Sequence, residues 1–176
     1  MIRTWRFALI AATAIASAAA HGQERAAAAE PDLAKAQQIN FFDLRGGAVV
    51  TDLPGYGYAA VPRALKEGWQ DFLWRYITTR DTLIGLVLIV DARHGLRTLD
   101  RELLAGFVPS GRPLLVLATK SDKLNVSARR AAAVAIVEQL RDAFGERADA
   151  MRVVTFSAAS GEGVPEADAI LLEWLA

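Results

Sequence analysis

An almost unbroken apolar run at residues 83–90 constrains the fold of this chain more than any other stretch of its sequence. The run contains leucine, isoleucine and valine with one glycine and no polar residue. It therefore suits a strand covered on both faces better than a surface helix. A second apolar run occupies residues 113–119. Both are typical of strands in a parallel sheet that helices cover on each side.

The rest of the chain continues this alternation of strands and helices. Further strands are expected at 39–44, 48–52 and 152–157, and helices from Pro62 onward and at 99–107, 133–144 and 164–174. In the first helix, large residues recur at helical spacing and are expected to be buried: Leu65, Trp69, Phe72, Leu73 and Tyr76. The predicted class is α/β, with a mostly parallel sheet in three α/β/α layers.

Composition excludes several kinds of function. The 176 residues are enough for one domain, and 20 basic side chains balance 20 acidic ones, so overall charge does not indicate nucleic-acid binding. Because cysteine is absent, disulfides, thiolate metal sites and cysteine nucleophiles are excluded. With only His21 and His94, a multi-histidine metal site is not expected.

The first 36 residues form an alanine-rich segment that differs from residues 37–176, where we place the domain. Arg3 and Arg6 precede a run of small and apolar residues that extends from Phe7 to Ala20. This is the layout of a secretory signal peptide. An exported protein of unrelated role is therefore one alternative. A misassigned start of the coding region and a buried helix are the others.

Polar or small residues directly follow the predicted strands, and ligands of such folds bind beyond the carboxyl ends of the strands. At the first of these strand ends, Asp52 can hold a Mg²⁺ ion through a water molecule. Leu53 and Pro54 follow it, and then Gly55, which would let its backbone N–H approach a γ-phosphate closely. A simple turn is the alternative.

The segment Thr119-Lys120-Ser121-Asp122 carries the more specific signal. The Asp122 carboxylate can accept hydrogen bonds from the N1–H and N2–H₂ groups of guanine, and adenine lacks that pair of donors. The Lys120 stem can lie along the purine while its ammonium group contacts neighbouring loops. A polar loop before a helix capped by Asn125 or Ser127 is the alternative.

A third strand end, Phe156-Ser157-Ala158, completes the set, because a small residue there lets a backbone N–H reach the guanine O6. Two basic pairs elsewhere are less specific. Arg93-His94 follows a strand and is expected to contact RNA phosphates, to order the neighbouring switch segment or to lie in a plain loop. Arg129-Arg130 is expected on a solvated helix face.

With these motifs the chain resembles the EngB/YihA-type ribosome-biogenesis GTPases, a branch of the P-loop GTPases. The resemblance spans about residues 37–176 and depends on five segments: Ile39-Asn40-Phe41-Phe42, Asp52-Leu53-Pro54-Gly55-Tyr56-Gly57-Tyr58-Ala59, Asp91-Ala92-Arg93-His94, Thr119-Lys120-Ser121-Asp122-Lys123 and Phe156-Ser157-Ala158. It implies a cytoplasmic protein that binds GTP and GDP with Mg²⁺, assists assembly of the large ribosomal subunit and supports normal division septum formation. We expect a monomer without stable membrane insertion.

Two family elements are not found in this sequence. No G-x-x-x-x-G-K-[ST] loop is present, and Ala36 stands where the resemblance implies a metal-binding threonine. The central first strand of the fold is therefore expected to be missing or replaced. Residues 7–16 are a candidate substitute, but their alanine content favours a helix. An incomplete copy with weak nucleotide binding follows, or a pseudo-GTPase that docks to the ribosome or RNA without turnover.

Overall fold

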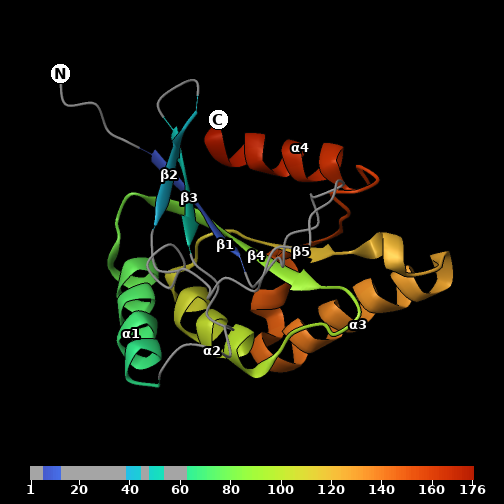
Figure 1. Cartoon of the computed structure of the whole chain (residues 1–176), viewed down its shortest axis with the longest axis horizontal. Coiled ribbons are helices and arrows are strands. Elements are labelled where there is room, and N and C mark those ends of the chain that lie inside the picture. Colours follow the sequence, from blue (N-terminus) through green and yellow to red (C-terminus); the bar gives the residue numbers. More distant parts are fainter. Residues whose placement is uncertain (1–5, 13–38, 45–47, 54–62) are drawn as a thin grey trace, which may run out of the picture.

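The computed structural model describes residues 6–12, 39–44, 48–53 and 63–176 (Figure 1). Its centre is a six-stranded sheet in the order β2-β3-β1-β4-β5-β6. The strands are β1 (Arg6–Ala12), β2 (Asn40–Asp43), β3 (Ala48–Leu53), β4 (Leu83–Asp91), β5 (Leu114–Thr119) and β6 (Arg152–Thr155). All neighbouring pairs are parallel except β2 with β3, which confirms a mostly parallel sheet.

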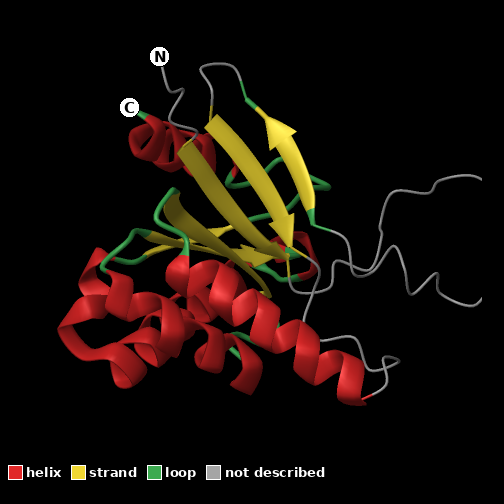
Figure 2. Ribbon diagram, turned by 90° about the vertical axis from the view of Figure 1, so that its left-hand side faces the viewer, coloured by secondary structure: helices red, strands yellow, loops and turns green. Residues whose placement is uncertain are grey.

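Helices cover both faces of this sheet (Figure 2). They are α1 (Arg63–Thr79), α2 (Thr98–Phe107), α3 (Val126–Phe144) and α4 (Val164–Leu175), with short 3-10 turns at Val108–Ser110, Ser121–Lys123 and Gly145–Ala150. On one face, Leu86 and Leu88 of β4 pack with residues of α1, α2 and α3, and on the other, Val87 and Ile89 pack against α4. The three-layer α/β/α prediction is confirmed. None of the helices in the described part of the chain is both long and apolar enough to cross a membrane.

The helix favoured for residues 7–16 is wrong for residues 7–12, where the substitute strand is found instead, and residues 13–16 lie outside the described residues. Residues Arg6–Ala12 form β1 instead, which lies between β3 and β4 and pairs with both in parallel. The physical reason is the position in the sheet, since backbone ladders on both sides satisfy every N–H and C=O group that a strand presents. That gain exceeds the small preference of alanine for helix. The central position is thus filled from within the alanine-rich segment.

The buried stripe predicted for α1 is correct in part. Leu73 is 3% exposed and Tyr76 is half-buried, but Phe72 is 43% exposed and lies outside the core. Leu73 and Ile77, four residues apart, occupy the face that packs against the sheet, which turns Phe72 to the side. The side chains of Leu65 and Trp69 lie outside the described residues.

Candidate functional site

The candidate site lies at the edge of the sheet where β4, β5 and β6 end. Asp91 at the end of β4 is in register with Thr119 at the end of β5, and Ala118 pairs with Thr155 of β6. Because these strands are parallel, the loops that follow them are neighbours in space. The Phe156 N–H donates to the Ala118 carbonyl oxygen at 2.8 Å, so the ladder continues into the loop after β6.

The loop after β5 turns sharply at Lys120. Lys120 has φ 60° and is the one non-glycine residue with positive φ in the described part of the chain. The turn leads into the 3-10 segment Ser121–Lys123, and the Ser121 N–H donates to the Phe156 carbonyl oxygen at 3.2 Å. Thr119 uses its hydroxyl within the sheet, where it donates to the Val90 carbonyl oxygen at 2.8 Å.

The helix that follows this loop begins with a side-chain cap. The Asn125 side chain accepts a hydrogen bond from the Ala128 N–H at 2.8 Å, whereas Ser127 already lies inside α3. Of the two candidate caps, Asn125 is therefore the correct one. The loop is both a helix-capping loop and the segment that carries Asp122.

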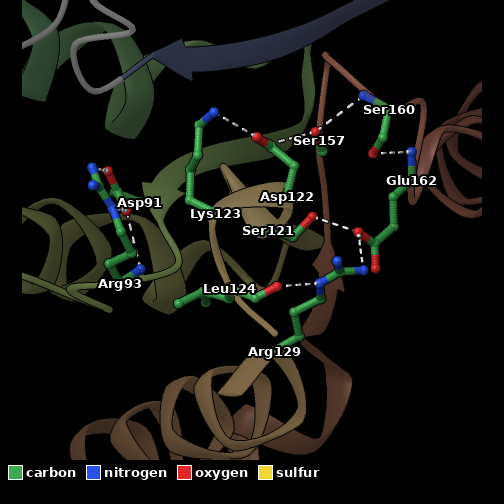
Figure 3. Close-up of polar contacts among 10 residues, drawn as sticks. All are labelled: Asp91, Arg93, Ser121, Asp122, Lys123, Leu124, Arg129, Ser157, Ser160 and Glu162. Atoms are coloured by element: carbon green, nitrogen blue, oxygen red, sulfur yellow. Dashed lines mark hydrogen bonds and ion pairs between the residues drawn. The ribbon is translucent and has the colours of Figure 1, made fainter. Parts of the chain in front are cut away.

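Asp122 lies between the loops after β5 and β6 (Figure 3). Its Oδ1 accepts a hydrogen bond from the Ser157 hydroxyl at 2.7 Å, and its Oδ2 lies 3.2 Å from the Lys123 ammonium. The hydrogen bond from Ser157, followed by that from Lys123, lowers the pKa of Asp122, so the carboxylate is ionised at neutral pH. An ionised carboxylate has about four acceptor positions, so two remain for donors on a ligand.

The loop after β6 holds Ser157 and Ala158 beside Asp122. Ser157 is fully buried, and its N–H donates to the Glu162 carbonyl oxygen at 3.0 Å. The Ser157 hydroxyl also accepts from the Ser160 N–H at 3.2 Å, while Ala158 is exposed. The fold therefore brings together two of the three predicted strand ends, Thr119–Asp122 and Phe156–Ala158.

Lys120 and Arg93 share one carboxylate on the adjacent strand. The Asp91 Oδ2 lies 3.1 Å from the Lys120 ammonium, and the Arg93 guanidinium binds both Asp91 oxygens at 2.9 and 2.7 Å. The hydrogen bonds from Arg93, and then those from Lys120, hold the pKa of Asp91 far below its usual range. The Lys120 ammonium thus contacts the last residue of β4, where the loop after this strand begins, and Arg93 forms a local ion pair.

Two residues of this network were not anticipated as parts of a site. Glu162 accepts hydrogen bonds from the Ser121 hydroxyl at 2.7 Å and from Arg129 at 3.0 Å. Arg129 also donates to the Leu124 carbonyl oxygen at 2.9 Å and is half-buried, so the solvated face expected for Arg129-Arg130 is correct for the exposed Arg130 and wrong for Arg129. Nothing in the local sequence signals this contact, because Glu162 and Arg129 are 33 residues apart.

Asp52 and Leu53 end β3, two strands away from β4 across β1. Asp52 is half-buried and Leu53 is 2% exposed, whereas Pro54 and Gly55 lie outside the described residues. Within the described ranges, no three carboxylate or imidazole groups are close enough to hold a metal ion. Because Mg²⁺ at nucleotide sites is usually held by one or two carboxylates together with waters and substrate phosphates, Asp52 fits a contribution through a water molecule.

A cavity of about 340 Å³ lies beside the cluster, between the loop after β4 and α3. Its walls are mainly alanine side chains of α3, with Leu124, Gln139 and residues 92–95 completing them. Asp122, Ser157 and Ala158 do not line it. The polar cluster around Asp122 is therefore distinct from this cavity.

Comparison with known proteins identifies the fold and the family. The structure resembles a crystal structure of a probable GTP-binding protein engB (TM-score 0.65, 15% identity, covering 96% of this chain and 98% of that one). It also resembles the apo elongation factor SelB of Methanococcus maripaludis (TM-score 0.63, 18% identity, 97% and 33%). A third neighbour is Era in complex with MgGDPNP and nucleotides 1506–1542 of 16S ribosomal RNA (TM-score 0.61, 14% identity, 97% and 56%). The fold is that of the P-loop GTPases.

Sequence relatives narrow the class. The chain is 44% identical over 141 residues to a probable GTP-binding protein EngB of an Azoarcus species, which covers 80% of this chain and 66% of that protein. The EngB protein of Neisseria meningitidis is 40% identical over 141 residues, with the same coverage. The chain belongs to the EngB family of GTP-binding proteins. It spans slightly less than two thirds of the length of the curated relatives that it matches. No family model matches the chain.

Proposed function

We propose that this chain binds GTP and GDP through Thr119–Asp122 and Phe156–Ala158, and that it acts in the cytoplasm as a monomer in assembly of the large ribosomal subunit. A role in division septum formation accompanies this proposal. The observation that carries it is the Asp122 carboxylate, which is ionised, held by Ser157 at 2.7 Å and partly open to solvent at 22% exposure. Such a group accepts the two parallel donors of guanine and leaves adenine unmatched.

The part of the proposed site that would bind the phosphates has fewer suitable side chains than the part that would bind the base. The sequence between β1 and β2 contains one lysine, Lys35, and Ala36 rather than serine or threonine follows it. Asp52 remains as a carboxylate that can reach Mg²⁺ through water, and Leu53, Pro54 and Gly55 follow it in the sequence. We therefore expect phosphates and Mg²⁺ to add little affinity.

A second candidate function follows from the same observation. A chain that recognises the guanine base but binds the phosphates weakly is consistent with a pseudo-GTPase. Such a protein would dock to ribosomal RNA or protein without hydrolysing GTP. The fold relative Era was solved with a segment of 16S ribosomal RNA, so an RNA partner is compatible with this architecture. A GTP hydrolysis assay with and without ribosomal particles separates the two candidates, since only the first predicts turnover.

Titration by NMR with GMP, IMP, AMP and GTP tests the nucleotide proposal. GMP should bind best, IMP less well because it lacks the N2 amino group, and AMP least. GTP should bind about as weakly as GMP, with dissociation constants on the order of millimolar. Micromolar, Mg²⁺-dependent binding of GTP would overturn the weak phosphate side, and equal binding of the three monophosphates would overturn guanine recognition.

A further inference from the structure

Glu162 connects three segments around the loop after β5, which carries Asp122 (Figure 3). Its Oε2 accepts the Ser121 hydroxyl at 2.7 Å and the Arg129 Nη1 at 3.0 Å. Arg129 in turn donates from Nε to the Leu124 carbonyl oxygen at 2.9 Å. One carboxylate thus joins the loop after β5, the first turns of α3 and the loop after β6.

The main chain of Glu162 adds a second connection to the same site. Its carbonyl oxygen accepts the Ser157 N–H at 3.0 Å, and the Ser157 hydroxyl donates to Asp122 at 2.7 Å. The Glu162 side chain meanwhile holds Ser121, the residue directly before Asp122. Glu162 is therefore connected to Asp122 in two ways, by hydrogen bonds through Ser157 and by its hydrogen bond to Ser121, which adjoins Asp122 in the chain.

The burial of these groups indicates what the contact does. Ser121 is fully buried, so its position is well defined, whereas the Arg129 and Glu162 side chains are each 31% exposed. An ion pair with that exposure adds little to global stability. Arg129 also lies near the N-terminus of α3, where the helix dipole disfavours a cation. The placement of the loops is thus the main consequence of this ion pair.

We propose that Glu162, together with Arg129, is a positioning residue that sets the guanine specificity of this site. It fixes the loop that carries Asp122 against the loop that carries Ala158, so the carboxylate meets both guanine donors at once. This inference rests on the proposed nucleotide-binding function. Without this contact the Asp122 carboxylate still accepts hydrogen bonds from a ligand. It no longer has the fixed geometry that distinguishes GMP from IMP and AMP.

The test compares base ranking in variants that remove the contact. Glu162→Ala and Arg129→Met should each lower the ratio of GMP to IMP affinity roughly fivefold, while AMP binding changes little. Ser121→Ala, a small change at a buried position, should lower the ratio in the same direction. Glu162→Gln keeps an acceptor for the Ser121 hydroxyl and should therefore retain part of the preference for GMP over IMP. The double variant Glu162→Ala/Arg129→Met should be no worse than either single one.

Matched controls come from exposed neighbours of each residue. Glu166→Ala at the start of α4 and Arg130→Met on α3 should leave the ratio unchanged. Thermal unfolding of every variant by circular dichroism shows whether it is folded, and Glu162→Gln and Ser121→Ala serve as tests if Glu162→Ala is not. An unchanged base ranking in the folded variants, whatever their melting temperature, would overturn this inference alone. A wild-type protein without guanine preference would overturn it together with the proposed function.

Discussion

The carboxyl ends of β5 and β6 and those of β1 and β3 lie at the same edge of one parallel sheet, but their chemistry differs. On the β5 and β6 side, hydrogen bonds join Asp122, Ser157, Ser121 and Glu162 into one network. On the other side, β3 ends in Asp52, and the sequence after β1 continues through small residues, Thr-Ala-Ile-Ala-Ser-Ala-Ala-Ala at 13–20.

This difference shows that a position in a sheet and a chemical site have separate requirements. Any segment that can extend its backbone can complete a parallel sheet, because the ladder uses only N–H and C=O groups. Binding a base or a phosphate needs particular side chains at particular places. We therefore expect damage to β1 to unfold the protein, and damage to the β5 and β6 loops to change base selectivity.

The largest effect is expected for Ile10→Pro in β1. Proline removes an N–H from a central strand that pairs on both sides, so the free energy of unfolding should fall by roughly 4 kcal/mol. Urea unfolding followed by tryptophan fluorescence measures this. Ile10→Val, which keeps the N–H and the strand propensity, is the control, and a similar small loss for both variants would show that β1 is not part of the stable sheet.

Gly163→Ala should have the next largest effect, on the loop that follows β6. Gly163 has φ 78°, and an added Cβ would overlap the Thr155 carbonyl oxygen. Gly161 has φ 77° but nothing within 4 Å of that position. We expect a loss of about 3 kcal/mol for Gly163→Ala and about 1 kcal/mol for Gly161→Ala in the same urea assay. Equal losses of unfolding free energy for the two variants would mean that the loop accommodates a Cβ at residue 163 without added strain.

Asp122→Asn sharpens the chemical side of the comparison. The amide presents an N–H₂ group where guanine has its amino group, and this group suits the C2 carbonyl oxygen of xanthine instead. The ratio of GMP to XMP affinity should change on the order of 100-fold, as measured by NMR titration. Asp142→Asn, an exposed aspartate on α3, is the control. Guanine preference that persists in Asp122→Asn excludes Asp122 as the base reader.

The smallest effect is expected for Asp91→Asn and depends on pH. Because Arg93 and Lys120 depress the folded-state pKa of Asp91, its contribution to stability is present above the unfolded pKa and is lost as pH falls. At neutral pH the variant should be less stable by roughly 1 kcal/mol, since partly exposed pairs are screened. The difference from wild type should shrink below about pH 4 in acid titrations of unfolding. Asp81→Asn, at an exposed aspartate, is the control.

Much of the architecture was predictable because apolar residues recur along the chain with the period of the helix or strand that buries them. The apolar runs at 83–90 and 113–119 became β4 and β5, and the predicted helix at 133–144 became the later part of α3. The helix begins earlier, after the Asn125 cap, because capping depends on one local hydrogen bond rather than on periodicity. Motif spacing likewise located Asp122 and Ser157, since parallel strands bring their carboxyl ends together.

By itself, the amino-acid sequence determined which segments are apolar enough to be buried and which polar groups follow them, since both depend on neighbouring residues in the chain. Only the tertiary structure decided that an alanine-rich segment becomes β1, because the unpaired edges of β3 and β4 supply a stabilisation that no local propensity contains. It alone also paired Glu162 with Ser121 and Arg129, residues 41 and 33 positions away, because contacts at such separations exist only after the sheet has formed.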